Sequence, residues 1–171
     1  MKRSQIFRMS IFGCKAGAVI LAWVFGFGLL AGSLASIGAQ AVFSDGRQSM
    51  AQFPGGSAFV PTLLPLLVSG FAVYAGWHIL LIPTAFWKAF SFSYVASGVI
   101  LAWGNAGWLV CGLGLFGSVC SLPVLWWYWL RHAGGEGFSG RTFLPALVAM
   151  LLISWLDLAV ISPFLENILT F

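Results

Sequence analysis

The sequence predicts an all-α fold, a polytopic membrane bundle of five transmembrane helices with a cytoplasmic N-terminus. Hydrophobic residues make up 60% of the 171 residues and charged residues only 7%, whereas soluble domains carry roughly 25% charged residues. Residues 59–130 contain one basic residue, Lys88, and no acidic residue. Apolar runs of this kind supply the roughly 20 residues with which a helix crosses about 30 Å of hydrocarbon.

Polar and Gly- or Pro-rich segments divide a single membrane domain, residues 1–171, into predicted spans. The first break contains Asp, Gly, Pro and Ser, and the breaks at 104–107 and 131–142 are rich in glycine, which is typical of loops. Pro83 is expected to end the second span, because proline interrupts a helix. The five predicted spans cover residues 18–41, 59–81, 85–103, 108–130 and 143–161.

The first span follows a basic leader that contains Lys2, Arg3, Arg8 and Lys15 and no acidic residue. Such a leader is compatible with the n-region of a signal peptide. However, the apolar segment after it, 16–43, is longer than the roughly 7–15 residues of a cleaved h-region. We therefore expect an uncleaved first span.

Glycines on the first and fourth spans predict close helix packing. Gly28 and Gly32 form a small-xxx-small pair, which lets another helix approach closely. Gly112, Gly114 and Gly117 give the fourth span a small face, which we expect to pack against the third span. The alternative is that glycine is simply more frequent in membrane helices.

Aromatic residues beside basic ones predict where the chain meets the membrane surface. Lys88 is flanked by Trp87 and is expected in an interfacial turn, with its ammonium directed outwards. A second group lies at the end of the fourth span. The predicted anchors there are Trp126, Trp127, Trp129 and Arg131.

The distribution of basic residues predicts the orientation. With the N-terminus in the cytoplasm and five spans, Arg47 is the only basic residue expected on the outer side. The inner side then holds Lys2, Arg3, Arg8, Lys15, Lys88, Arg131 and Arg141. This bias follows the positive-inside rule, so we expect a multi-pass protein of the cell membrane with its C-terminus outside.

Asp157 and His78 are the candidate residues of an intramembrane polar site. A carboxylate inside an apolar span costs about 2.5–3.5 kcal/mol on insertion scales and is a functional candidate by default. The alternative for Asp157 is a structural hydrogen bond to Ser154 or to a polar group on another helix. A single histidine in a bundle is likewise more often hydrogen-bonded than catalytic.

Other functional classes find no support in the sequence. The net charge of +4 comes from residues at the ends of apolar segments, so no nucleic-acid surface is expected. Cys14, Cys111 and Cys120 show no zinc-binding spacing. The catalytic motifs of membrane proteases are missing. We therefore expect no metal, no cofactor and no enzymatic activity.

Residues 63–132 resemble the membrane family of stage II sporulation protein M. The resemblance rests on a proline-bearing second span and on Lys88, Ala89 and Phe90 at the opening of the third span. A small-residue stretch and a proline follow in the fourth span, at 112–123. Family members often have polar residues beside that proline, where this chain has Val, Cys, Ser and Leu.

The resemblance implies five spans, a cytoplasmic N-terminus and a scaffold or complex subunit that works with envelope-remodelling proteins. We accordingly expect a non-enzymatic membrane subunit that organises partner proteins, in bacterial envelope remodelling or sporulation. Its expected partners are the lipid bilayer and a membrane or envelope protein. The alternative is a small transporter or a substrate-binding component of one. In that case Asp157, His78, Ser91, Ser93 and Ser97 would line one cavity.

Overall fold

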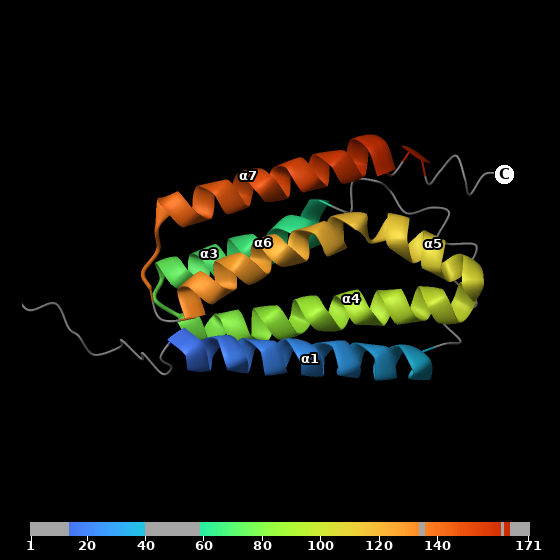
Figure 1. Ribbon diagram of the computed structural model, residues 1–171, viewed down its shortest axis with the longest axis horizontal. Coiled ribbons are helices and arrows are strands. Elements are labelled where there is room, and N and C mark those ends of the chain that lie inside the picture. Colours follow the sequence, from blue (N-terminus) through green and yellow to red (C-terminus); the bar gives the residue numbers. More distant parts are fainter. Residues whose placement is uncertain (1–13, 40–58, 134–135, 162, 165–171) are drawn as a thin grey trace, which may run out of the picture.

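The computed structural model describes residues 14–39, 59–133, 136–161 and 163–164, and all regular secondary structure in these ranges is helical (Figure 1). Lys2, Arg3 and Arg8 of the basic leader lie outside the described residues, as do Arg47 and Glu166. The helices are α1 (Cys14–Gly38), α3 (Phe59–Tyr74), η3 (His78–Leu80), α4 (Leu81–Trp103), α5 (Asn105–Gly114), α6 (Phe116–Ala133), α7 (Gly140–Leu156) and the π-helical turn η4 (Asp157–Ile161).

The long helices lie side by side and run in alternating directions. In Figure 1, α1 is at the bottom edge, α4 lies next to it, α3 and α6 lie behind and above, and α7 is at the top. α1 and α4 run parallel, because α3 returns the chain between them. Gly17 of α1 contacts Ala133, so the start of α1 lies beside the end of α6.

Three helical segments are long and apolar enough to cross a membrane: Ala16–Gly38, His78–Trp103 and Gly140–Ile161. A fourth span results if Gly107–Gly114 and Phe116–Ala133, which meet at 54°, are counted together. Thr62–Tyr74 is a shorter apolar helix. The predicted all-helical, multi-pass membrane class is therefore confirmed. The described residues contain three to four candidate spans.

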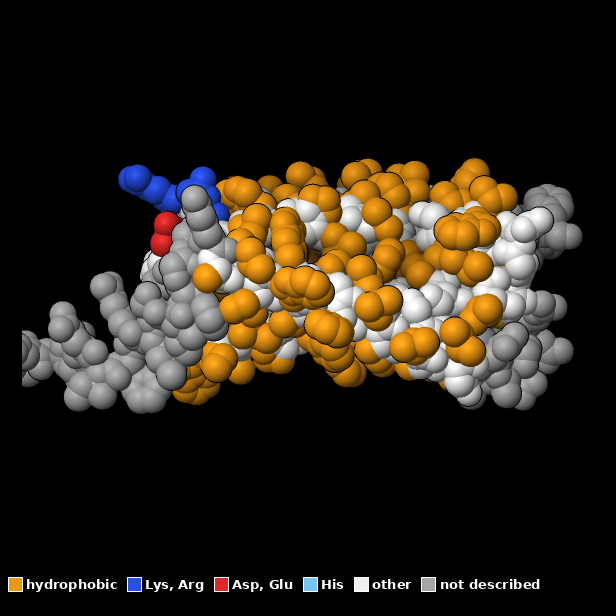
Figure 2. Space-filling view, turned by 60° about the horizontal axis from the view of Figure 1, so that its bottom comes forward, with side chains coloured by type: hydrophobic (Ala, Val, Ile, Leu, Met, Phe, Trp, Pro, Cys, Tyr) orange, Lys and Arg blue, Asp and Glu red, His pale blue; other side chains and the backbone are white. Residues whose placement is uncertain are grey.

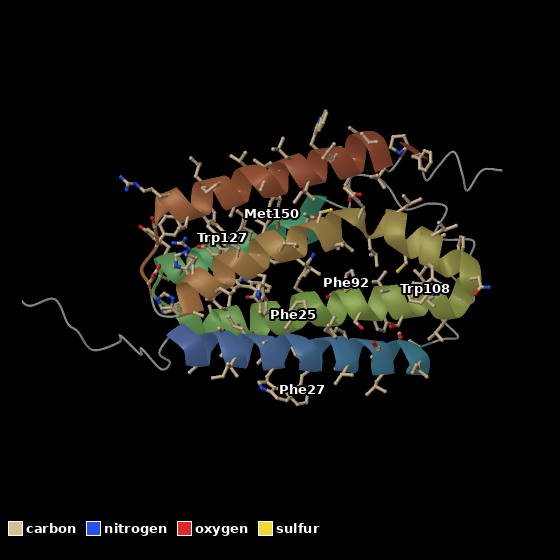
Figure 3. The ribbon with its side chains drawn as sticks, viewed as in Figure 1. Phe25, Phe27, Phe92, Trp108, Trp127 and Met150 are labelled. Carbon is tan, nitrogen blue, oxygen red and sulfur yellow. The ribbon has the colours of Figure 1, made fainter. Side chains whose placement is uncertain are left out.

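The surface has the apolar character that a bilayer requires. Figure 2 shows hydrophobic side chains along the whole visible flank, with the coloured basic and acidic side chains at one end. Large apolar side chains of α1 point outwards, among them Trp23 and Phe27. In Figure 3, Phe27 points away from the bundle, whereas Phe25 of the same helix points into it. Phe25 contacts Trp126 of α6 edge to face, with 5.7 Å between ring centroids.

The apolar core lies among α3, α6 and α7 and extends to Leu21 of α1 and to Leu81 and Ala85 of α4. Its fully buried members include Leu66 of α3, Leu125, Tyr128 and Trp129 of α6, and Met150 of α7. α3 and α6 contribute three residues each to this cluster, so both helices lie at the centre of the core.

Glycines bring the backbones of α1 and α4 into contact. A Cβ atom at Gly28 would lie 2.7 Å from the carbonyl oxygen of Phe86 and 2.8 Å from Cβ of Ala89. A Cβ atom at Gly32 would meet the carbonyl oxygen of Phe90 and lie 2.9 Å from the nitrogen of Tyr94. Any larger side chain at these positions would separate the two helices.

The glycines of the fourth predicted span are placed differently. A Cβ atom at Gly112 would have no described atom within 4 Å, and Gly114 is exposed. The contact with α4 falls instead on Gly107, where a Cβ atom would lie 2.8 Å from the carbonyl oxygen of Val99. Gly117 faces η4 rather than α4. The difference arises because the chain bends after α5, so α6 does not continue along the direction that α5 takes against α4.

Candidate functional site

The break between α5 and α6 interrupts one candidate membrane span at Leu115. Leu115 has φ −104° and ψ 12°, and its N–H donates to the carbonyl oxygen of Cys111. Regular α-helical bonding resumes with the N–H of Val119, which donates to the carbonyl oxygen of Leu115 at 2.8 Å. The N–H groups of the first turn of α6 have no acceptor within their own helix. In an apolar environment they need acceptors from elsewhere in the protein.

Asp157 supplies one of these acceptors from another helix. Its carboxylate accepts a hydrogen bond from the backbone N–H of Gly117, and the residue is only 7% exposed. A Cβ atom at position 117 would lie 2.6 Å from Oδ2 of Asp157, so glycine makes the approach possible. A carboxylate at a helix N-terminus also interacts favourably with the helix dipole, by up to about 2 kcal/mol in partly buried geometries. Asp157 thus caps α6.

Lys88 of α4 is directed to the same turn of α6. Its Nζ donates to Oγ of Ser118 at 3.4 Å, and the residue is 5% exposed. Ser118 follows Gly117 in the chain, so a buried ammonium and a buried carboxylate contact consecutive residues of α6. The hydrogen bond of Lys88 joins α4 to α6.

The buried position of Lys88 differs from the predicted interfacial anchor. Pro83 does not end a helix here; it lies in the first turn of α4. The N–H groups of a first turn have no acceptor within the helix, so a proline there costs no hydrogen bond. Lys88 is therefore two turns inside the helix instead of in a surface turn. The neighbouring Trp87 is 65% exposed and points to the outside.

Ser154 adds an unused hydroxyl near Asp157. It lies three residues before Asp157, a spacing that places two side chains on the same side of a helix. Ser154 is 3% exposed, and its Oγ has no hydrogen-bond partner among the described residues. A buried hydroxyl in this state is uncommon, because the large majority of buried polar side-chain atoms have a partner.

His78 lies in a separate polar region, at the opposite end of α6. It is close enough to His132 for the two imidazoles to interact electrostatically. His132 is buried, with Nδ1 3.2 Å from the carbonyl oxygen of Glu136 and Nε2 3.2 Å from Oγ1 of Thr142. Fifteen residues of α6 separate His132 from Gly117, which corresponds to roughly 22 Å. The structure therefore does not bring Asp157 and His78 together.

Two of the three serines proposed for a transport cavity form hydrogen bonds between helices. Ser93 of α4 donates to the carbonyl oxygen of Leu29 at 2.7 Å and shares a hydrogen bond of 2.6 Å with Ser33. Ser97 donates to Ser33 at 3.3 Å. Ser93 and Ser97 thus face α1, away from the α6 turn that holds Asp157.

The tryptophans at the end of α6 have three different environments. Trp127 is 40% exposed, and the guanidinium of Arg131 lies 5.6 Å from its ring centroid. Trp126 is half-buried against α1. Trp129 is fully buried, and its Nε1 donates to Oγ of Ser69 at 2.8 Å. Consecutive residues of a helix point in different directions, so one of the four predicted anchors is a core residue.

The sequence gives weak signals for three residues of these regions. Ser118 directly follows the glycines of the fourth predicted span in the sequence, where nothing distinguishes it as a partner of Lys88. Ser154 was named only as a candidate partner of Asp157. His132 adjoins the basic residue Arg131 and resembles a surface residue. The glycine density around 112–117 is the one local signal that a break could occur there.

Comparisons with protein-family models, with curated proteins and with solved structures found no significant match to this chain. Within the described residues, no group of three or more His, Cys, Asp or Glu side chains is placed to hold a metal ion.

Proposed function

We propose that this protein is a non-enzymatic integral membrane subunit that organises partner proteins. The observation that supports this most directly is the hydrogen bond between the Asp157 carboxylate and the N–H of Gly117. Asp157, the acidic residue within a candidate span, thereby joins two helices. Ser33, Ser93 and Ser97 are used in the same way between α1 and α4.

The exposed side of α1 supports an interaction role. α1 lies at one edge of the bundle and packs mainly on α4 (Figure 1). Its outer side carries large apolar residues at intervals of three and four, which form one continuous helical stripe. In a bilayer this stripe contacts lipid or the membrane helix of another protein. Its members are Val19, Trp23, Phe27, Leu30, Leu34 and Ile37.

We further infer that the chain crosses the cell membrane five times, with a cytoplasmic N-terminus and an extracytoplasmic C-terminus. The alternating directions of α1, α3, α4, α5–α6 and α7 support five crossings, although α3 alone is short for a span. The contact between Gly17 and Ala133 supports a common side for the basic leader and for Arg131. The positive-inside rule assigns that side to the cytoplasm.

The setting we propose is envelope remodelling or sporulation in bacteria. Its support is the resemblance of residues 63–132 to the stage II sporulation protein M family, with Lys88, Ala89 and Phe90 at its centre. The buried position of Lys88 gives this motif a structural reason, since the side chain joins α4 to α6.

Site-specific photo-crosslinking in cells tests the proposed function. A photoreactive residue replaces Trp23 on α1 in one variant and Trp155 on α7 in another; the two tryptophans are 67% and 59% exposed. We expect one defined protein adduct from one of these faces and only lipid adducts from the other. Purification in mild detergent should then retain the same protein in a stoichiometric amount.

Two results would contradict the proposal. One is lipid adducts alone from both faces, together with purification of the chain without a stoichiometric protein. The other is retention of a defined small molecule in place of a protein, which would favour the transporter. A reporter fused after Phe171 tests the topology separately: alkaline phosphatase should be active there and a cytoplasmic fluorescent protein dark.

A further inference from the structure

We infer that an exposed stripe on α6 binds one anionic phospholipid. The phosphate lies on the guanidinium of Arg131, and an acyl chain follows the helix towards the middle of the membrane. The stripe consists of positions that repeat every fourth residue along the exposed side of α6. We call it the α6 stripe; its members are Arg131, Trp127, Pro123 and Val119. It lies on a different helix from the exposed apolar side of α1 that supports the proposed function.

The α6 stripe is continuous, because residues four positions apart lie on neighbouring turns of the same helix face. All four members are exposed, with Val119 at 47% and Trp127 at 40%. Beside the stripe, Trp126 packs against α1. Leu125 and Trp129, on another side of α6, belong to the apolar core. The stripe is therefore the part of α6 that is left to face the bilayer.

Arg131 forms the charged end of the stripe. It belongs to the last turn of α6, two residues before the end of a candidate span. Its guanidinium lies 5.6 Å from the ring centroid of Trp127, and a contact with an aromatic face leaves the N–H donors of the guanidinium free for hydrogen bonds. In the part of the chain that the structure describes, no acidic side chain forms an ion pair with Arg131. Trp127 thus holds a guanidinium that can bind a phosphate through two parallel hydrogen bonds.

Positive charge predominates at this end of the bundle. Lys15 belongs to the first turn of α1, which lies beside the end of α6 through the contact of Gly17 with Ala133. Arg141 belongs to the first turn of α7. Among the described residues, Glu136 is the one acidic residue at this end, and Figure 2 shows the coloured charged side chains gathered there. Such an end attracts the anionic headgroups of a membrane surface.

The apolar part of the stripe favours a lipid over a free anion. From Trp127 to Val119 the stripe extends over eight residues, which corresponds to roughly 12 Å along the helix. One leaflet contributes about 15 Å to a hydrocarbon core of about 30 Å. An acyl chain below a phosphate at Arg131 therefore has an apolar surface for most of its length. Trp127 lies near the end of the bundle at which α7 begins (Figure 3), as expected for an indole at headgroup depth.

Native mass spectrometry of the full chain, stripped of lipid in detergent, tests the site. The probes are phosphatidylglycerol and phosphatidylcholine with identical acyl chains, each titrated separately. We expect the first phosphatidylglycerol to bind about fivefold more tightly, the factor that corresponds to one cation beside an anionic headgroup. Equal affinities of the two lipids would overturn the inference, because an exposed apolar helix face would then account for all binding.

Arg131→Gln and Arg141→Gln are a matched pair, because each removes one positive charge from an exposed arginine at the same end of the bundle. We expect Arg131→Gln to weaken the binding of phosphatidylglycerol about fivefold and to leave that of phosphatidylcholine unchanged. Arg141→Gln should retain most of the affinity for phosphatidylglycerol, since Arg141 is not part of the α6 stripe. Equal losses in the two variants would show that the lipid responds only to net charge, and would overturn the site.

The role of the indole ring is tested by Trp127→Leu, which keeps an apolar side chain but removes the face on which the guanidinium lies. We expect a loss of about threefold in affinity for phosphatidylglycerol, as for an exposed cation–π contact. Trp155→Leu, at a 59% exposed position of α7, is the control. Losses of the same size in both variants would overturn the pairing of Trp127 with Arg131 as part of the site.

Glycerol 3-phosphate distinguishes a lipid site from a free anion site, because it has a phosphate but no acyl chain. A large molar excess should leave phosphatidylglycerol bound, and displacement would overturn the lipid site. The substituted residues are exposed, where substitutions usually have small effects on stability, so all variants are expected to fold. The measurements involve no other protein, so the lipid site and the proposed function can fail independently.

Discussion

The backbone N–H of Gly117 and the carboxylate of Asp157 form a hydrogen bond between α6 and the turn that follows α7. Forty positions separate the two residues in the chain, yet the bond joins them beside the break between α5 and α6. It satisfies a backbone donor that the break would otherwise leave in an apolar environment. This contact explains how an acidic residue is tolerated within an apolar segment.

The first prediction concerns the side chain of Asp157. Replacement by Ala removes the acceptor of the Gly117 N–H and should lower the free energy of unfolding by about 1–2 kcal/mol. Asp157→Asn should cost less, because its amide oxygen still accepts the hydrogen bond. Thermal unfolding in detergent measures both, with Glu136→Gln as the exposed acidic control. Equal loss in Asp157→Ala and Glu136→Gln would contradict the cap.

The second prediction concerns the contact between α1 and α4. Gly28→Leu forces a side chain against the carbonyl oxygen of Phe86 and should destabilise the bundle by at least about 1–3 kcal/mol. Gly26→Leu on the same helix is the control, because a Cβ at Gly26 has no described atom within 4 Å. Chemical denaturation measures the free energy of unfolding of both variants. Similar stability of the two would show that α1 is not held through Gly28.

The third prediction separates the tryptophans of α6. Trp129→Phe breaks the hydrogen bond from Nε1 to Ser69 and leaves a buried hydroxyl with one fewer partner. We expect a loss of about 1–3 kcal/mol in the free energy of unfolding. Trp127→Phe, at a half-exposed position, should change stability by less than about 0.5 kcal/mol. The reverse order would mean that Trp129 lies at the membrane surface.

The sequence predicted the class of the fold because that class depends on composition. A chain with few charges and apolar runs of span length has few alternatives to a helical membrane bundle. The glycine pair at Gly28 and Gly32 was also informative, since four-residue spacing has a direct geometric meaning in a helix. That both residues contact α4, by contrast, could be learned only from the structure.

The candidate site was less accessible from the sequence because its contacts depend on two local choices of the chain. Pro83 is compatible with the end of one helix or with the first turn of the next, and only the second choice buries Lys88. The break at Leu115 determines where the first turn of α6 lies and therefore which residue Asp157 caps. Neither choice leaves a periodic signal in the sequence.

The fourth prediction distinguishes a buried Lys88 from an interfacial one by its chemical reactivity. The chain contains three lysines, Lys2, Lys15 and Lys88, and an amine-acylating reagent that crosses membranes can reach all three if they are exposed. Lys88 is 5% exposed and hydrogen-bonded to Ser118, so we expect its acylation in the folded protein to be at least about tenfold slower than after denaturation in dodecyl sulfate. Peptide mass spectrometry quantifies each lysine, and the leader lysines provide the internal reference. Acylation of Lys88 at the same rate before and after denaturation would show that Lys88 lies at the membrane surface and does not join α4 to α6.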